Sequence, residues 1–307
     1  MPAGRSGVSA VGNSAAVDSA RALKTLVAYV RDGSVFVSRG KAEVRVAGGR
    51  GWSRPRWSPD GELIAALKGS QLWTMKADGT GKRRVTSRAA SGPSWAPDGE
   101  SIAFSSVSCS GGPGVYAISA TERGAVPEVL FPSYCRGEQL PPEPVVAAKT
   151  GGSVKERLRV DDAVAWSPDG SKVAFRGGDC ESVYDSCLSV GDVASGGERT
   201  VAAYGGGGLE NAGFAVVPSW RGDGGRLAWT AYERGKRALH VVEYDTVSGV
   251  RRDVGVAQDR EFAYLDESRG VVTGSFKGGS WVMIVDLDGG GRVAFHRGSQ
   301  PSVQPGK

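Results

Sequence analysis

Several features that mark other protein classes are missing from this chain of 307 residues. No apolar run approaches the roughly 18 residues that a membrane-spanning helix requires. The 47 glycines, about twice the usual share, follow no three-residue period, which excludes a collagen triple helix. Only two histidines occur, His240 and His296, so any reaction that needs an imidazole depends on one of them.

The sequence motifs of common enzyme classes are also missing. The segment 278–282 (GGSWV) fails the G-x-S-x-G pattern of a hydrolase nucleophile at its last position. The segment 79–82 (GTGK) lacks the upstream glycine and the following Ser or Thr of a phosphate-binding loop, and no H-E-x-x-H motif is present. We therefore expect no catalytic activity, no cofactor and no metal site.

The charge distribution gives no sign of a nucleic-acid or membrane-surface partner. The formal net charge of +5 comes from 38 basic and 33 acidic residues that are mixed along the chain. The basic runs 82–84 (KRR) and 251–252 (RR) open predicted outer strands, where charge suits an exposed sheet edge. We expect a soluble monomer without nucleic acid and without a membrane span.

A repeated motif organises the sequence. Each copy has a tryptophan, then Asp-Gly, then a stretch in which apolar residues alternate with small ones. Four copies align: Arg56–Leu67, Ser94–Ser105, Ala165–Arg176 and Ser219–Thr230. A fifth, degenerate copy is Ala263–Ser275, with Tyr264 in the place of the tryptophan.

The motif predicts a strand, a tight turn and a second strand. Proline fixes φ, aspartate caps the turn with its side chain, and glycine takes a positive φ. The tryptophan ends an inner strand and is large enough to fill the wedge between neighbouring sheets. Two more predicted strands follow each copy, for example Gln71–Lys76 and Arg83–Thr86. Four strands per repeat are typical of a propeller blade.

We therefore predict an all-β fold: a six-bladed β-propeller of four-stranded antiparallel blades over residues 25–303. Thr25–Val30, Ser34–Ser38 and Ala42–Ala47 form one blade that lacks its inner strand. The tail Gln300–Val303 resembles Gly92–Trp95, so we expect it to supply that strand and close the ring; the rival is Ala16–Ala20. The predicted blades are 25–51 with 300–303, 52–91, 92–160, 161–216, 217–260 and 261–299, and residues 1–24 and 304–307 are predicted tails.

The W-S-P-D-G repeat followed by a strand of the I-A-F type resembles the propeller repeat of the TolB family, over about residues 25–303. The resemblance implies a six-bladed propeller that binds proteins, usually in the cell envelope. TolB carries an α/β domain before its propeller, whereas about 24 residues precede the propeller here. A Tol-type transport role is therefore not expected from the fold alone.

All long insertions are predicted on one face of the ring, which we call the insertion face. It carries the loops between second and third strands and the connections between blades, whereas the opposite turn face carries the short Asp-Gly turns. Long loops are uncommon unless they are functional or disordered, so the insertion face is the candidate binding face. Its candidate contact residues are Trp52, Tyr134, Arg136, Glu138, Tyr184, Asp185, Tyr204, Glu210, Asn211 and Phe214.

The four cysteines all lie in these insertions. Cys180 and Cys187 flank a short hairpin loop, and Cys109 and Cys135 belong to the same blade and face. We expect two local disulfides, while four free thiols or a zinc site are the alternatives. Disulfides favour an extracytoplasmic location (periplasm, cell envelope or secreted), although Met1–Lys24 has no apolar signal region and a cytoplasmic location is the alternative.

Together these features predict a non-enzymatic scaffold of the cell envelope that binds a protein or peptide with its insertion face. One alternative is a propeller enzyme, such as a lyase or glycan-processing protein, with carboxylates at the channel mouth. Asp161 and Asp162 are acidic residues of the insertion face that this alternative would use. A second alternative is a sensor domain for a carbohydrate or other small ligand.

Overall fold

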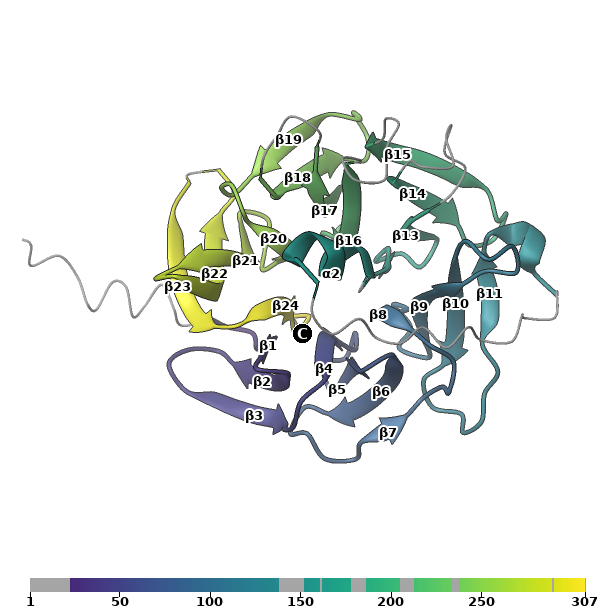
Figure 1. Ribbon diagram of the computed structural model, residues 1–307, viewed down its shortest axis with the longest axis horizontal. Coiled ribbons are helices and arrows are strands. Elements are labelled where there is room, and N and C mark those ends of the chain that lie inside the picture. Colours follow the sequence, from purple (N-terminus) through teal and green to yellow (C-terminus); the bar gives the residue numbers. More distant parts are fainter. Residues whose placement is uncertain are drawn as a thin grey trace, which may run out of the picture.

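The protein is a six-bladed β-propeller (Figure 1). The computed structural model describes residues 23–137, 152–160, 162–177, 186–204, 213–233, 238–288 and 290–306. Within them, six antiparallel sheets of four strands each surround a central axis. Both the fold class and the number of blades predicted from the repeat are confirmed.

The blades follow one another along the chain, and the strands of each are given from the channel outward. Blade 1 has β24 (Ser299–Val303), β1 (Val27–Arg31), β2 (Ser34–Ser38) and β3 (Glu43–Ala47). Blade 2 has β4 (Trp52–Trp57), β5 (Leu63–Lys68), β6 (Gln71–Lys76) and β7 (Arg83–Arg84). Blade 3 has β8 (Ser91–Trp95), β9 (Ser101–Val107), β10 (Pro113–Ser119) and β11 (Glu128–Phe131).

The remaining blades have the same order. Blade 4 has β12 (Ala165–Trp166), β13 (Lys172–Arg176), β14 (Ser186–Asp192) and β15 (Glu198–Tyr204). Blade 5 has β16 (Phe214–Trp220), β17 (Arg226–Tyr232), β18 (His240–Asp245) and β19 (Arg251–Val254). Blade 6 has β20 (Arg260–Tyr264), β21 (Arg269–Phe276), β22 (Gly279–Asp286) and β23 (Arg292–Arg297).

The C-terminal strand closes the ring. β24 pairs with β1 in antiparallel register, with Val303 opposite Val27 and Ser302 opposite Ala28. This pairing is the closure predicted from the tail, and it covers the edge that β1 would otherwise expose. Residues 1–22 of the expected N-terminal tail lie outside the described residues. Leu23, which the prediction placed in that tail, is buried in a core cluster with β1 and blade 6.

The repeated tryptophans lie between blades, as their size predicted. Trp57 and Trp95 are buried in clusters that join blades 1 and 2 and blades 2 and 3. Trp95 and Trp220 each donate from Nε1 to a carbonyl in the inner strand of the preceding blade, at 3.1 Å in both cases. The indole therefore fills the wedge and also ties neighbouring inner strands together.

Most inner strands carry a bulge at the same place in the repeat. The register shifts between Ser53 and Arg56 in β4 and between Val216 and Ser219 in β16, with similar shifts in β8, β20 and β24. Four residues at the bulges have positive φ although none is glycine: Arg54, Val217, Glu261 and Gln300. Such backbone is costly unless the surroundings hold it, so the residues around the channel are firmly positioned.

Candidate binding face and central channel

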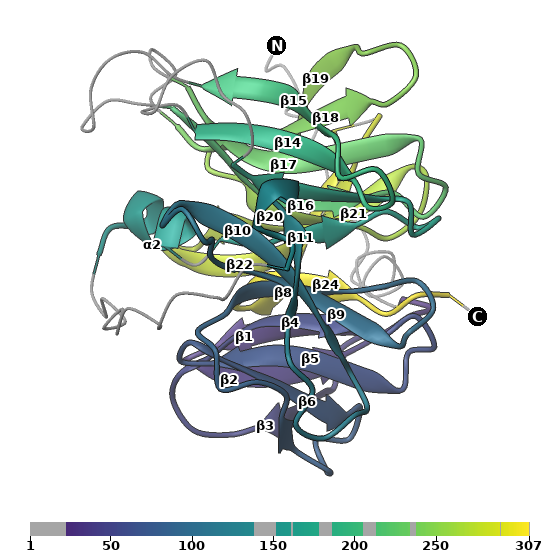
Figure 2. The ribbon, with the colours of Figure 1, turned by 90° about the vertical axis from the view of Figure 1, so that its right-hand side faces the viewer.

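Within the described residues, α2 (Val154–Val160) and the first turns of the blades lie on opposite sides of the ring (Figure 2). Figure 2 shows α2 on one side of the ring and the C-terminus on the other. Gln304, next to the C-terminus, donates to the Gly61 carbonyl in the first turn of blade 2, at 2.8 Å. That contact identifies the C-terminal side as the turn face and the side of α2 as the insertion face.

The insertion between blades 3 and 4 contains two helical segments that the sequence analysis took for loop. The first is the 3-10 helix η1 (Ser133–Cys135), and the second is α2. α2 begins with a capping box in which Ser153 N–H donates to Glu156 Oε2 at 2.6 Å and Glu156 N–H donates to Ser153 Oγ at 3.3 Å. The Ser-x-x-Glu spacing of Ser153 and Glu156 was a helix signal that the prediction missed.

α2 lies over the centre of the ring in Figure 1 and contacts β16. Leu158 is buried in a cluster with Phe214, Val216 and Leu239 of blade 5. Lys155 places its ammonium 3.5 Å from the centre of the Tyr232 ring. The insertion thus brings an amphipathic helix to the channel mouth, with its apolar side against blade 5.

A buried ion pair joins inner strands across the channel. Arg54 Nη1 lies 2.9 Å from Glu261 Oε1, and the two side chains are 1% and 6% exposed. Glu261 also accepts from Thr273 Oγ1 at 2.7 Å and from Gln300 N–H at 3.1 Å. Burial alone would raise the pKa of Glu261, but the Arg54 charge and these hydrogen bonds hold it below its usual value.

A second buried pair lies where the insertion rejoins the propeller. Asp162 is buried and forms an ion pair with Arg176 of β13. Burial raises the pKa of Asp162, and the Arg176 charge offsets only part of that effect. Burial of Arg56 in β4 lowers its pKa to about 10, and repulsion from the positive charge of Arg54 lowers it in the same direction. The two carboxylates described at the channel, Glu261 and Asp162, are both engaged by arginines.

Two predicted contact residues are not at the surface. Trp52 is 3% exposed and packs edge-on against Trp73, with its Nε1 donating to the Gly48 carbonyl at 3.2 Å. Phe214 is 1% exposed and supports α2. Their positions at strand starts suggested exposure, but packing between blades covers them, so both are removed from the set of surface contacts. Tyr204 is half-buried and accepts from Trp229 Nε1 at 3.2 Å.

Tyr134 and Arg136 lie beside the junction of blades 3 and 4. Tyr134 is 67% exposed, and its hydroxyl is 3.1 Å from Ser110 Oγ. Arg136 donates from Nη2 to the Val193 carbonyl at 3.1 Å, which is in the turn between β14 and β15. Arg136 also donates to the Leu130 carbonyl of the outer strand β11, so it lies beside the outer parts of blades 3 and 4 and not at the channel mouth. Five further predicted contacts lie outside the described residues: Glu138, Tyr184, Asp185, Glu210 and Asn211.

A disulfide holds the start of the insertion. Cys109 and Cys135 are bonded, with their Cα atoms 5.7 Å apart, and this is one of the two predicted pairs. Cys187 is also disulfide-bonded, while Cys180 lies outside the described residues. Among the described residues there is no free cysteine and no group of three or more His, Cys, Asp or Glu side chains that could hold a metal ion.

The inner-strand residues at the channel are not among the contact residues predicted from the sequence. Arg54, Glu261 and Gln300 occupy the same place in successive repeats, two residues before the position aligned with Ser94. The signal was the X-Pro pair in Arg54-Pro55 and Gln300-Pro301. Alignment of the repeats can find these positions, but only the ring brings their side chains together.

Comparison with known proteins gives structural neighbours only. No protein-family model and no curated protein sequence matches the chain. TolB from Acinetobacter baumannii superimposes with a TM-score of 0.69 at 16% identity, covering 93% of this chain and 68% of that one. The chain therefore shares the propeller fold of this TolB structure. A protein provisionally named TolB from Agrobacterium tumefaciens gives 0.61 at 15% identity, with 90% of each chain covered.

The same propeller architecture also occurs in an enzyme. An oligogalacturonate lyase in complex with manganese superimposes with a TM-score of 0.53 at 13% identity, covering 86% of this chain and 70% of the lyase chain. The same propeller fold therefore occurs in TolB and in a lyase, and the likeness assigns the fold without the activity. Within the described residues, no helix is long and apolar enough to cross a membrane.

Proposed function

We propose that this TolB-type propeller is a non-enzymatic scaffold of the cell envelope that binds a protein partner with the centre of its insertion face. The observation that carries the proposal is the placement of α2. Its apolar side is fixed against blade 5 by Leu158, while the exposed Arg157 and the half-exposed Arg159 remain at the surface. A positioned helix across a channel mouth is a rigid platform on which binding residues are held in place.

The charge of α2 suggests the chemistry of the partner. Three basic residues, Lys155, Arg157 and Arg159, accompany one acidic residue, Glu156. Neither Arg157 nor Arg159 makes an ion pair with a described residue: Arg157 Nη1 donates to the Gly152 carbonyl at 2.9 Å. An acidic protein segment would therefore find guanidinium donors that are not held by a carboxylate of any described residue.

A capture experiment with charge-reversed bait tests the proposal. We expect the wild-type chain to retain a protein from an envelope and secreted extract that Arg157→Glu/Arg159→Glu does not retain. The matched control is Arg45→Glu/Arg84→Glu, which makes the same charge change on the exposed outer strands β3 and β7. A protein held equally by all three baits, or by none, would contradict binding through α2.

The disulfide supports a location outside the cytoplasm, because disulfides persist mainly in oxidising compartments. The test is a thiol count on denatured protein taken directly from cells, with alkylation before lysis. No reactive thiol at Cys109 or Cys135 is the expected result. Free thiols at both positions would place the protein in a reducing compartment instead.

A further inference from the structure

The first turns of successive blades form a stack on the turn face. In this stack the glycine of one Asp-Gly turn lies against the proline turn of the preceding blade. A Cβ atom on Gly99 would lie 3.8 Å from Pro59 Cδ, and one on Gly170 would lie 3.6 Å from Pro97 Cγ. For Gly61 the neighbour is the side chain of Gln304, which follows β24 of blade 1.

The stack is interrupted between blades 4 and 5. A Cβ atom on Gly224 would meet nothing within 4 Å, although Pro168 is the expected neighbour. The φ of Gly224 is +73°, close to the +74° and +75° of Gly99 and Gly170, so the turn itself is unchanged. The blade 5 turn therefore lacks the close approach to the preceding turn that Gly99 and Gly170 show.

Polar contacts within blade 5 hold its first turn. Thr246 donates from Oγ1 toward the carbonyls of Gly224 and Gly225, at 3.2 Å each. The corresponding residues of blades 2, 3 and 4 are Ala77, Ala120 and Val193, which have no hydroxyl and make only the backbone bond at this place.

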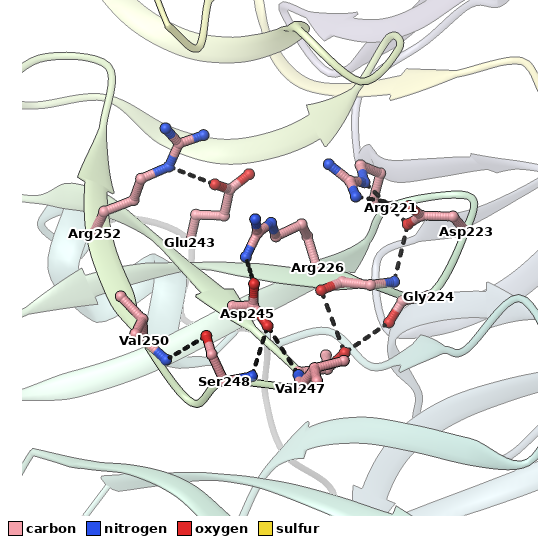
Figure 3. A network of polar contacts seen from close by, with 12 residues as sticks. Arg221, Asp223, Gly224, Arg226, Glu243, Asp245, Val247, Ser248, Val250 and Arg252 are labelled. Carbon is pink, nitrogen blue, oxygen red and sulfur yellow. Dashed lines mark hydrogen bonds and ion pairs between the residues drawn. The ribbon is translucent and has the colours of Figure 1, made fainter.

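Asp223 is also bound within its own turn. Arg221 donates from Nε to Asp223 Oδ1 at 2.9 Å and from Nη2 to Asp223 Oδ2 at 2.6 Å. Figure 3 shows this network around Gly224 and Asp245.

A pocket of about 500 Å³ occupies the gap. Its floor consists of core residues from the junction of blades 4 and 5: Val190, Leu227, Trp220 and Tyr244. Trp220 is only partly buried, as is the equivalent Trp166 of blade 4, whereas Trp57 and Trp95 are 5% and 7% exposed. A concave site of this size with an apolar, aromatic floor is typical of small-ligand pockets.

The rim of the pocket is charged but balanced. Asp169 and Asp223 supply acceptors, and Lys172 and Arg199 supply donors. Neither Lys172 nor Arg199 makes an ion pair with a described residue. Lys172 donates to Ser171 Oγ at 3.1 Å, and Arg199 Nη1 donates to the Tyr244 hydroxyl at 3.5 Å. An anion in the pocket would be repelled by the two carboxylates, and a cation would be repelled by the two basic groups. A purely apolar ligand would remove all four charged groups from water without replacing their hydrogen bonds.

We propose that this pocket binds a neutral sugar ring, as a monosaccharide or as one unit of a glycan. A pyranose has an apolar face of C–H groups that suits the exposed part of the Trp220 ring. It also has hydroxyls at its edge that both donate and accept, which suits a rim of carboxylates and basic groups. The site is on the turn face, so it is independent of the protein-binding surface around α2.

Saturation-transfer NMR with methyl pyranosides of glucose, galactose, mannose and N-acetylglucosamine tests the proposal. We expect at least one pyranoside to bind the whole chain with a dissociation constant of about 1 mM, because such ligands have few apolar atoms. Gly222→Phe should abolish the signal, since Gly222 lines the pocket and has open space where a side chain would begin. Gly40→Phe, at an equally open glycine in blade 1, is the matched control and should retain it.

A substitution at the rim of the pocket distinguishes a loss of ligand binding from a loss of folding. Arg199→Gln removes an exposed charged donor and should weaken binding about tenfold without changing the melting temperature. Indole and succinate serve as an apolar aromatic and an anionic probe. The proposal is overturned if no pyranoside binds, if Gly222→Phe leaves the signal unchanged, or if only indole or succinate binds.

Discussion

At the residue scale, buried charged side chains join the inner strands around the channel of this propeller. Arg54 and Glu261 are almost fully buried, and Thr273 and Gln300 satisfy the remaining oxygen of Glu261. A buried pair of this kind adds little net stability over a well-packed apolar pair, but loss of one partner leaves an uncompensated charge. The pair therefore fixes the relative position of blades 6 and 2 across the ring.

Removal of Arg54 alone should be costly. We expect Arg54→Met to lower the free energy of unfolding by about 3–5 kcal/mol, because Glu261 remains charged and buried. The double variant Arg54→Met/Glu261→Leu should recover a large part of that loss. Urea unfolding of the two single variants and the double variant measures the coupling, and additive losses would show that the pair does not interact.

Acid should weaken the protein through its turn aspartates. Hydrogen bonds from Ser167 and Ser171 lower the pKa of Asp169 to about 2. The hydrogen bonds from the Arg221 guanidinium lower the pKa of Asp223 to about 2 as well. Since both values lie below those of the unfolded chain, the stabilisation is present above about pH 4 and is lost as the pH falls toward 2. Melting temperatures between pH 2 and 5 should fall less steeply for Asp169→Asn than for wild type; identical slopes would contradict this account.

At the element scale, the conformation of an insertion depends on a few anchors. α2 is only seven residues long, too short to be stable as an isolated helix. It is held by the capping box of Ser153 and Glu156 at its start and by Leu158 in the cluster with Phe214. Tertiary burial and capping together specify a helix that hydrophobic periodicity alone is too short to indicate.

Truncation of the buried anchor should release α2. We expect Leu158→Ala to lower the free energy of unfolding by about 2–4 kcal/mol, because it leaves a cavity beneath the helix. Val44→Ala, on the surface of β3 at 62% exposure, should change it by less than about 0.5 kcal/mol. Chemical denaturation of both variants checks the prediction, and equal effects would mean that Leu158 contributes no more than a surface residue.

At the scale of the whole molecule, closure by β24 makes the six blades one unit. The strand pairs with β1, and Gln300 of β24 accepts from Arg54 N–H of blade 2 at 2.7 Å. The last residues thus join blade 1 to the adjacent blade 2. Without this strand, the edge of β1 would be exposed and the contacts of β24 with β4 of blade 2 and with β20 and β21 of blade 6 would be lost.

Deletion of residues 299–307 should therefore open the ring. We expect the loss of several kcal/mol, a large fraction of the roughly 5–15 kcal/mol that stabilises a folded domain, together with self-association through the exposed edge of β1. Deletion of residues 305–307 alone keeps β24 and is the control. Thermal melting and light scattering of the two truncated chains distinguish them, and a monomeric, fully stable chain without β24 would refute the closure role.

The sequence by itself determined the repeat, the number of blades and the strand that closes the ring. These depend on local chemistry, because Pro-Asp-Gly sets a turn and alternation sets a strand wherever they occur. Tertiary structure alone decided that Trp52 and Phe214 are covered, that Arg54 meets Glu261, and that α2 lies over the channel. It also decided that the turn stack breaks beside Gly224, because contacts between blades depend on how each sheet is placed, and no local pattern encodes that placement.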